Sequence, residues 1–88
     1  MTRAIWKHVL LEYTIDVVAV DPIVRFVGVD PASGCPAVWI EQTTDDGGPR
    51  GERLQLAAVA TGDRIKANWA YLGTVIIDDL VWHIHAIN

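Results

Sequence analysis

The sequence predicts a mostly β protein, a small antiparallel β-barrel or sandwich-like domain, and three observations support this fold class. Apolar segments rich in valine and isoleucine alternate with polar residues at a period of two, which is typical of half-buried strands. Turn residues separate these segments at short and regular spacing. A length of 88 residues is enough for one domain, so we expect residues 1–88 to form a single small β domain.

The first half of the chain contains four predicted strands. They cover residues 4–11, 13–20, 23–29 and 37–42. The pair Asp21-Pro22 ends the second strand. A turn cluster at residues 30–36, in which Pro31 and Gly34 set backbone dihedrals, separates the third strand from the fourth.

Alternation along these strands predicts which side chains share a face. In the third strand, one face receives Ile23, Arg25, Val27 and Val29, and the other receives Val24, Phe26 and Gly28. In the fourth strand, Val38 and Ile40 lie on one face, and Trp39 and Glu41 on the other.

A polar, glycine-rich segment at residues 43–51 follows, and its composition predicts a mobile surface loop. Residues 52–60 resume the alternation. Their leucine, glutamine and alanine content also fits a short helix, but the β-type segments around them favour a strand. Residues 61–68 form a second turn-rich link.

The pattern in the last part of the chain predicts a β-hairpin. The predicted strand at residues 69–77 places Trp69, Tyr71 and Gly73 on one side. Asp78-Asp79 is typical of a hairpin turn, from which residues 80–87 return as the closing strand. The total is six or seven short strands.

Composition limits the classes of function. A net charge of −4 argues against binding of duplex nucleic acid, which requires a basic face, but allows a small phosphate ligand held by a few local arginines. No apolar run approaches the ~20 residues of a membrane span, and the first residues do not resemble a signal peptide. Cys35 is the only cysteine, which excludes an intramolecular disulfide and fits a reducing cytoplasm.

The apolar content is high for so small a domain. Half of the residues are hydrophobic and four are tryptophans, so we expect part of this surface to face another subunit or a ligand. Trp39 and Trp82 are expected to be core or interface anchors. Trp6 and Trp69 lie nearer to the segment starts and are expected to be partly exposed.

His83 and His85 in the closing strand permit two interpretations. Residues two apart on a strand share a face, so the two imidazoles are able to begin a metal site, for which His8 or an acidic residue would supply a third ligand. No spacing identifies that third ligand. The alternative is a terminal strand in which Leu80, Trp82 and Ile84 point inward and both histidines face water or a partner. We favour this alternative.

No catalytic constellation is visible in the sequence. Asp45-Asp46 and Asp78-Asp79 are adjacent carboxylates in predicted turns, where turn chemistry explains them. Ser33 and Cys35 lack any supporting histidine or carboxylate spacing. The sequence therefore predicts a protein that is not an enzyme, with no catalytic residue, no metal and no cofactor.

The segment Ala60–Arg64 offers the best candidate ligand contacts. Thr61 provides a hydroxyl, Gly62 allows close approach of a backbone amide, and Arg64 provides a fork of donors, although an ordinary turn explains the same residues. An aromatic plane beside an arginine suits nucleobase stacking. The predicted ligand-binding residues are Trp6 and Trp69 for stacking, Arg53 and Arg64 for phosphates, Thr61 and Gly62 for polar contacts, and Lys7 and His83 as further candidates.

Four segments in this order resemble one family of small phage and prophage proteins. They are "IWKHVL", "GCPAVW", "ATGDRI" and "WAYLGTVIIDDLVWHI", and the closing "YLGT…VWHI" is the most specific. The resemblance covers nearly the whole chain. The sequence departs from the family pattern where Cys35 precedes Pro36 and where the tail runs on as "HAIN", which leaves the exact ligand open.

The resemblance implies a function in immune evasion. The family includes an anti-CBASS sponge, a phage protein that binds the cyclic dinucleotide signal of bacterial immunity without cutting it. It implies a small, mostly β fold assembled as a homo-oligomer, with a tetramer favoured, in the cytoplasm of the infected bacterial host. The implied partner is a cyclic dinucleotide such as 3'3'-cGAMP or a related signal.

Two other functions stay open. One is a non-enzymatic phage accessory protein that docks a host protein through its apolar surface. The other, ranked last, is a metal-dependent enzyme that uses His83 and His85. Excess apolar surface and the absence of a catalytic pattern agree with sequestration. A two-fold interface between copies would present each arginine and each aromatic ring twice to a nearly two-fold symmetric ligand.

Overall fold

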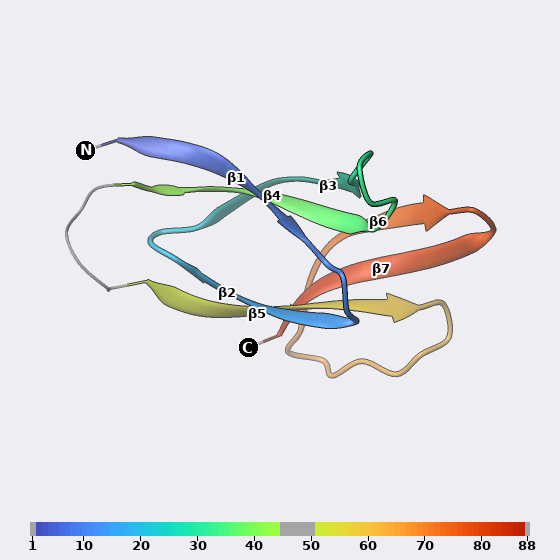
Figure 1. Ribbon diagram of the computed structural model, residues 1–88. Coiled ribbons are helices and arrows are strands. Elements are labelled where there is room, and N and C mark those ends of the chain that lie inside the picture. Colours follow the sequence, from blue (N-terminus) through green and yellow to red (C-terminus); the bar gives the residue numbers. More distant parts are fainter. Residues whose placement is uncertain (1, 45–50, 88) are drawn as a thin grey trace.

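The fold is a two-layer β-sandwich, as the sequence predicted. The computed structural model describes residues 2–44 and 51–87 (Figure 1). Its strands are β1 (Arg3–Val9), β2 (Thr14–Ala19), β3 (Ile23–Val29), β4 (Pro36–Thr43), β5 (Glu52–Ala60), β6 (Ala70–Ile77) and β7 (Leu80–Ile87). They form a three-stranded sheet in the order β1-β4-β3 and a four-stranded sheet in the order β2-β5-β7-β6. All pairs are antiparallel.

The core lies between the two sheets and follows from strand alternation. Val38 and Ile40 share one face of β4, as predicted, and this face points inward, where they meet Leu56 of β5 and Ile84 of β7. These four side chains are fully buried. Each contributes roughly 1.5–3 kcal/mol of hydrophobic stabilisation to this thin core.

Strand β3 contains a β-bulge, so its side chains do not divide between two faces as predicted. Val24 lies opposite Ile40, but Val27 lies opposite Val38, because the register shifts between Val24 and Phe26. Val24 and Val27 both pack against the core. Strict alternation had placed them on opposite faces, and this expectation is wrong because the extra residue of a bulge changes the phase of the strand.

A second bulge shifts the register of β6 between Tyr71 and Gly73. Tyr71 lies opposite His85, whereas Gly73 lies opposite Ile84, so the prediction that the two share a side is wrong. Gly73 allows the two sheets to approach where β3 and β6 lie alongside each other. A Cβ atom on Gly73 would lie 2.9 Å from Cβ of Val27, closer than packed side chains tolerate.

One strand prediction and one turn prediction in the second half of the chain are confirmed, and one burial prediction is wrong. The residues from 52 to 60 form a strand and not a helix. Asp78 has a φ of 54° in the tight turn between β6 and β7, as the hairpin prediction requires. Leu80 is 59% exposed, so its expected inward position is wrong, because it follows directly on the turn at the end of the hairpin.

Two further expectations concern the loop between β4 and β5. The predicted mobile loop lies mostly outside the described residues, as does the carboxylate pair Asp45-Asp46. Within residues 2–44 and 51–87, no helix is long and apolar enough to cross a membrane.

Candidate ligand-binding site

A chain of polar side chains crosses the outer face of the four-stranded sheet at its β6–β7 edge. Nε2 of His83 lies 2.9 Å from the hydroxyl of Thr61, and its Nδ1 lies 3.0 Å from the hydroxyl of Thr74. The Thr74 hydroxyl lies 2.6 Å from that of Tyr71. Both imidazole nitrogens of His83 are thus occupied, and these hydrogen bonds join β6 and β7 to Thr61, the first residue of the link between β5 and β6.

His85 lies next to this chain and is only 4% exposed. It points to the same face as His83, as their spacing predicts, but its expected position facing water or a partner is wrong. Trp69 of the β5–β6 link and Tyr71 of β6 cover it: their ring centroids lie 6.2 Å and 5.5 Å from that of the imidazole. Among the described residues, Nδ1 of His85 finds no hydrogen-bond partner.

A hollow of about 250 Å³ lies over these residues, and we call it the His83 pocket. It is lined by Val59, Ala60, Thr61, Gly62, Asp63, Ile65, Tyr71, His83 and His85. Its base combines imidazole and hydroxyl groups with one aromatic ring, and its wall is the turn that follows β5. The pocket therefore offers both stacking and hydrogen-bonding groups.

The turn at Thr61-Gly62 is arranged differently from the predicted anion cradle. Gly62 adopts a φ of 95° with open space beside it, which suits a glycine. Asp63 folds back: its carboxylate accepts a 3.1 Å hydrogen bond from the amide of Ala60, and its own amide donates to the Ala60 carbonyl. The protein's own carboxylate therefore occupies this concavity, and the ordinary-turn interpretation holds there.

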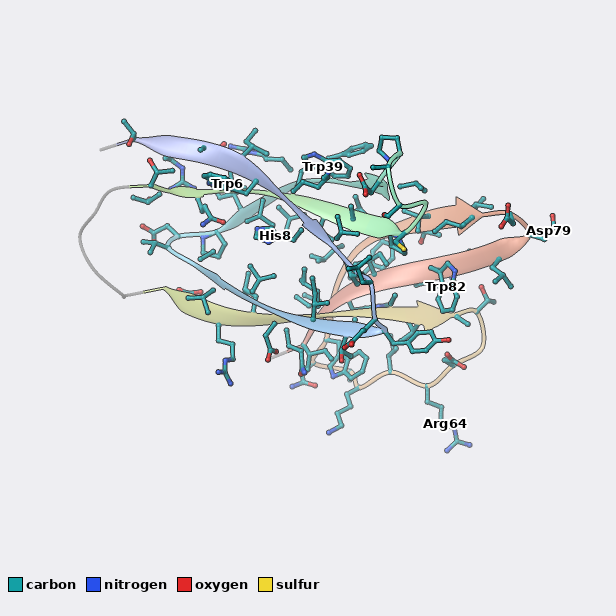
Figure 2. The ribbon with its side chains drawn as sticks, in the orientation of Figure 1. Trp6, His8, Trp39, Arg64, Asp79 and Trp82 are labelled. Carbon is teal, nitrogen blue, oxygen red and sulfur yellow. The ribbon has the colours of Figure 1, made fainter. Side chains whose placement is uncertain are left out.

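The cations divide between the two sides of the molecule. On the three-stranded sheet, Arg3 and Arg25 both pair with Glu41, and Lys7 pairs with Asp30. The remaining cations of residues 2–44 and 51–87 are Arg53, Arg64 and Lys66, which form no ion pair in this part of the chain. Arg64 extends away from both sheets (Figure 2).

The structure does not bring all the predicted residues together. Thr61, Gly62 and His83 line the His83 pocket, and Trp69 lies beside it against His85. Arg53 is at the other end of β5, six residues from Val59 and thus about 20 Å away along the strand. It lines a separate hollow with Asp16, Gln55 and Ile87.

Trp6 and Lys7 belong to the three-stranded sheet, on β1. Trp6 is 54% exposed, as expected for a partly exposed tryptophan. The ammonium of Lys7 is 2.7 Å from Oδ1 of Asp30. This hydrogen bond, with a second from the Ser33 hydroxyl, lowers the pKa of Asp30 to about 2. Lys7 therefore has a structural partner and does not face the His83 pocket.

The interior of the sandwich contains another histidine, His8, which points from β1 toward the opposite sheet (Figure 2). Burial lowers the pKa of His8, and the neighbouring side chain of Gln42 opposes this effect in part. In the described residues no three His, Cys, Asp or Glu side chains gather closely enough to hold a metal ion. His83 and His85 have no third ligand beside them in that set.

A second hollow of about 360 Å³ lies at one end of the sandwich. It is lined mainly by apolar side chains, among them Leu10, Tyr13, Ile77 and Trp82, and Cys35 lies at its edge. The ring centroids of Tyr13 and Trp82 lie 5.6 Å apart.

The turn between β3 and β4 is held by Ser33. Its hydroxyl donates a hydrogen bond to the Asp30 carboxylate and accepts one from the Cys35 amide, which is the turn role predicted for this segment.

Three residues of the site were not predicted: Tyr71, Thr74 and His85 as a buried group. A signal for Thr74 was available, since a two-residue hairpin at Asp78-Asp79 places Ile77 opposite Leu80 and therefore Thr74 opposite His83. The same count does not give the partner of Tyr71, because the bulge in β6 shifts the register between Gly73 and Tyr71.

Comparison with known proteins gives a family but no described relative. The family model of DUF7352, a domain of unknown function, matches residues 1–88. No curated protein and no solved structure matches the chain.

Proposed function

Since the chain belongs to the DUF7352 family, a domain of unknown function, we propose a function from its sequence and its site. We propose that it is a phage immune-evasion protein that binds and sequesters a cyclic nucleotide second messenger of bacterial anti-phage defence without cleaving it. It would act in the cytoplasm of the infected host. The sequence resemblance to sponge proteins supports the biological setting, and the His83 pocket supports the chemistry.

The observation that carries the proposal is the combination of groups at the His83 pocket. The pocket is lined by the ring of Tyr71, the imidazoles of His83 and His85 and the hydroxyl of Thr61, and Nδ1 of His85 is unpaired among the described residues, so a nucleobase has both stacking and hydrogen-bond partners there. Arg64 and Lys66, which form no ion pair with the described residues, belong to the segment that closes the pocket. They are available to a phosphate although the chain is acidic overall.

The size of the pocket favours an assembly. A hollow of about 250 Å³ is below the ~300–1,000 Å³ that encloses a drug-sized ligand, so one protomer would hold one base of a cyclic dinucleotide. A two-fold axis would bring a second copy of the pocket to the other base. The tetramer implied by the resemblance supplies such axes.

The affinity that sequestration requires is accessible to these groups. Nanomolar binding corresponds to about −12 kcal/mol. Stacking provides ~1–3 kcal/mol per base, and a hydrogen bond to a charged group provides ~1.5–3 kcal/mol. Two bases and two phosphates held by paired protomers would therefore supply roughly 5–12 kcal/mol, which is much of it.

Native mass spectrometry of the purified protein with a panel of cyclic di- and trinucleotides tests the proposal. We expect an oligomer that retains one intact ligand per pair of protomers, and nucleotide recovered unchanged after heat release. Released linear nucleotide would show an enzyme instead. A strictly monomeric protein that binds no member of the panel would refute the proposal.

A specific observation also favours the docking alternative. On the outer face of the three-stranded sheet, Ile5, Ile23 and Phe26 are exposed, and Phe26 packs against Trp39 with ring centroids 5.3 Å apart. A soluble protein that shows such a cluster has a place for a protein partner. A host protein that co-purifies with the wild type but not with Phe26→Ser, while nucleotide binding is absent from both, would support this function.

A further inference from the structure

Among the described residues, His8, Gln42 and His85 each have a buried side-chain atom without a hydrogen-bond partner, and of these three His85 lines the His83 pocket. His85 is 4% exposed, and its Nδ1 atom has no hydrogen-bond partner in residues 2–44 and 51–87. An unpaired buried polar atom destabilises a fold, and native proteins contain few of them. The neighbouring His83 shows that the same sheet face is able to pair both nitrogens of an imidazole.

The surroundings of His85 indicate what a partner for this atom would be. The imidazole lines the His83 pocket, with the Tyr71 ring set edge-on at 65° and the Trp69 ring tilted at 59°. Ile65 and Val59 add apolar surface to the same pocket. A planar ring with hydrogen-bonding atoms on its rim would suit a pocket lined by Tyr71, Val59, Ile65 and His85, whereas an aliphatic ligand would leave Nδ1 unpaired.

The charged groups near the pocket indicate where the rest of such a ligand would lie. Asp63 is part of the pocket wall and its carboxylate is turned to the Ala60 amide, so a phosphate is disfavoured inside. Arg64 is the next residue and extends outward (Figure 2). A base inside and a phosphate outside is the orientation that these charges favour.

We infer that the His83 pocket is a nucleobase subsite in which Nδ1 of His85 forms a hydrogen bond to the polar edge of the base. The inference deepens the proposed function and rests on it for the larger ligand. His85 is a specificity-determining residue in this reading, and His83 is a positioning residue that fixes β6, β7 and the Thr61 turn around it. The ligand class is a nucleotide with a phosphate outside the pocket.

The test measures binding of adenosine, guanosine, cytidine and uridine monophosphates and of cyclic dinucleotides by calorimetry, and follows the ring nitrogens of His85 by NMR. We expect the Nδ1 resonance of His85 to move on binding. His85→Leu should weaken binding roughly tenfold or more. His85→Asn, which keeps a polar atom near the position of Nδ1, should weaken it less. His8→Leu is the matched control, because His8 also has an unpaired buried nitrogen but lies on the other sheet.

The outcomes separate the two proposals. Full affinity of His85→Leu for a cyclic dinucleotide, or an unmoved His85 resonance in the saturated wild type, overturns the inference and leaves the proposed function standing. Mononucleotides that move the His85 resonance while cyclic dinucleotides do not bind would keep the subsite and refute sequestration. If no member of the panel binds the wild type, both are overturned.

Discussion

Nζ of Lys7 lies 2.7 Å from Oδ1 of Asp30, and this contact ties the edge strand β1 to the turn between β3 and β4. Asp30 is 3% exposed, so its carboxylate depends on the few groups that reach it. Its other oxygen accepts from the hydroxyl and the amide of Ser33. One carboxylate thus organises the turn and anchors a strand that has a single sheet partner.

This arrangement predicts a loss of stability in acid. Because the folded protein lowers the pKa of Asp30 to about 2, below its ordinary value of about 3.9, its contribution is complete above pH ~4 and is lost as the pH falls toward 2. Urea unfolding at several pH values between 5 and 2 should show a falling free energy of unfolding. In Asp30→Asn this slope should be shallower, with a remainder from Glu41, whose pKa Arg3 and Arg25 lower. An unchanged slope in the variant would contradict the assignment.

The hydroxyls around His83 should contribute to stability as well as to the site. Thr61→Val and Thr74→Val each remove one partner of the imidazole, and each should reduce the free energy of unfolding by about 1 kcal/mol. Chemical denaturation measures this. Thr14→Val is a suitable control, because Thr14 is exposed on the same sheet without a side-chain hydrogen bond in the described chain. Equal losses in all three variants would argue against the network.

Gly73 should be sensitive to the smallest possible side chain. Gly73→Ala would place a methyl group 2.9 Å from Cβ of Val27 and push β3 away from β6, at a loss of roughly 1–3 kcal/mol. Thermal and urea unfolding of Gly73→Ala, Val27→Gly and the double variant form a cycle. The double variant should lose less than the sum of the single losses; strict additivity would show that the two positions do not meet.

Two isoleucines on neighbouring strands test the position of the core. Ile84 of β7 is 0% exposed and Ile76 of β6 is 67% exposed. Ile84→Ala should therefore lower the free energy of unfolding by ~2–5 kcal/mol, whereas Ile76→Ala should change it by less than about 0.5 kcal/mol. Equilibrium urea unfolding of both variants decides this. Comparable losses at the two positions would mean that the outer face of this sheet is covered.

Strand positions were predictable because they follow from local patterns. The shared face of Val38 and Ile40 and the hairpin at Asp78-Asp79 needed only alternation and turn chemistry. The bulges in β3 and β6 were not predictable. Valine and phenylalanine suit either face of a strand, so a one-residue change of phase leaves no mark in the hydrophobic pattern.

The site was predicted in part for a related reason. Thr61, Gly62 and His83 were identified by chemistry, and the fold places them in one pocket. The burial of His85 was missed because it depends on the β5–β6 link folding back over the sheet. Two apolar residues in that polar link, Ile65 and Trp69, were the available signal. Arg53 and Trp6 were predicted as ligand contacts but lie far from the His83 pocket, because the sequence does not show how far apart two strands or loops lie in space.

The strand order also constrains when the sheets are able to form during translation. Strand β2 is at the edge of the four-stranded sheet, so β5 is its one sheet partner, and Thr14 lies opposite Ala57. On the ribosome, β2 emerges well before Ala57 does. Val17 and Ala19 are buried in the folded protein. During synthesis they therefore stay exposed to water or bound to a chaperone until β5 has left the ribosome.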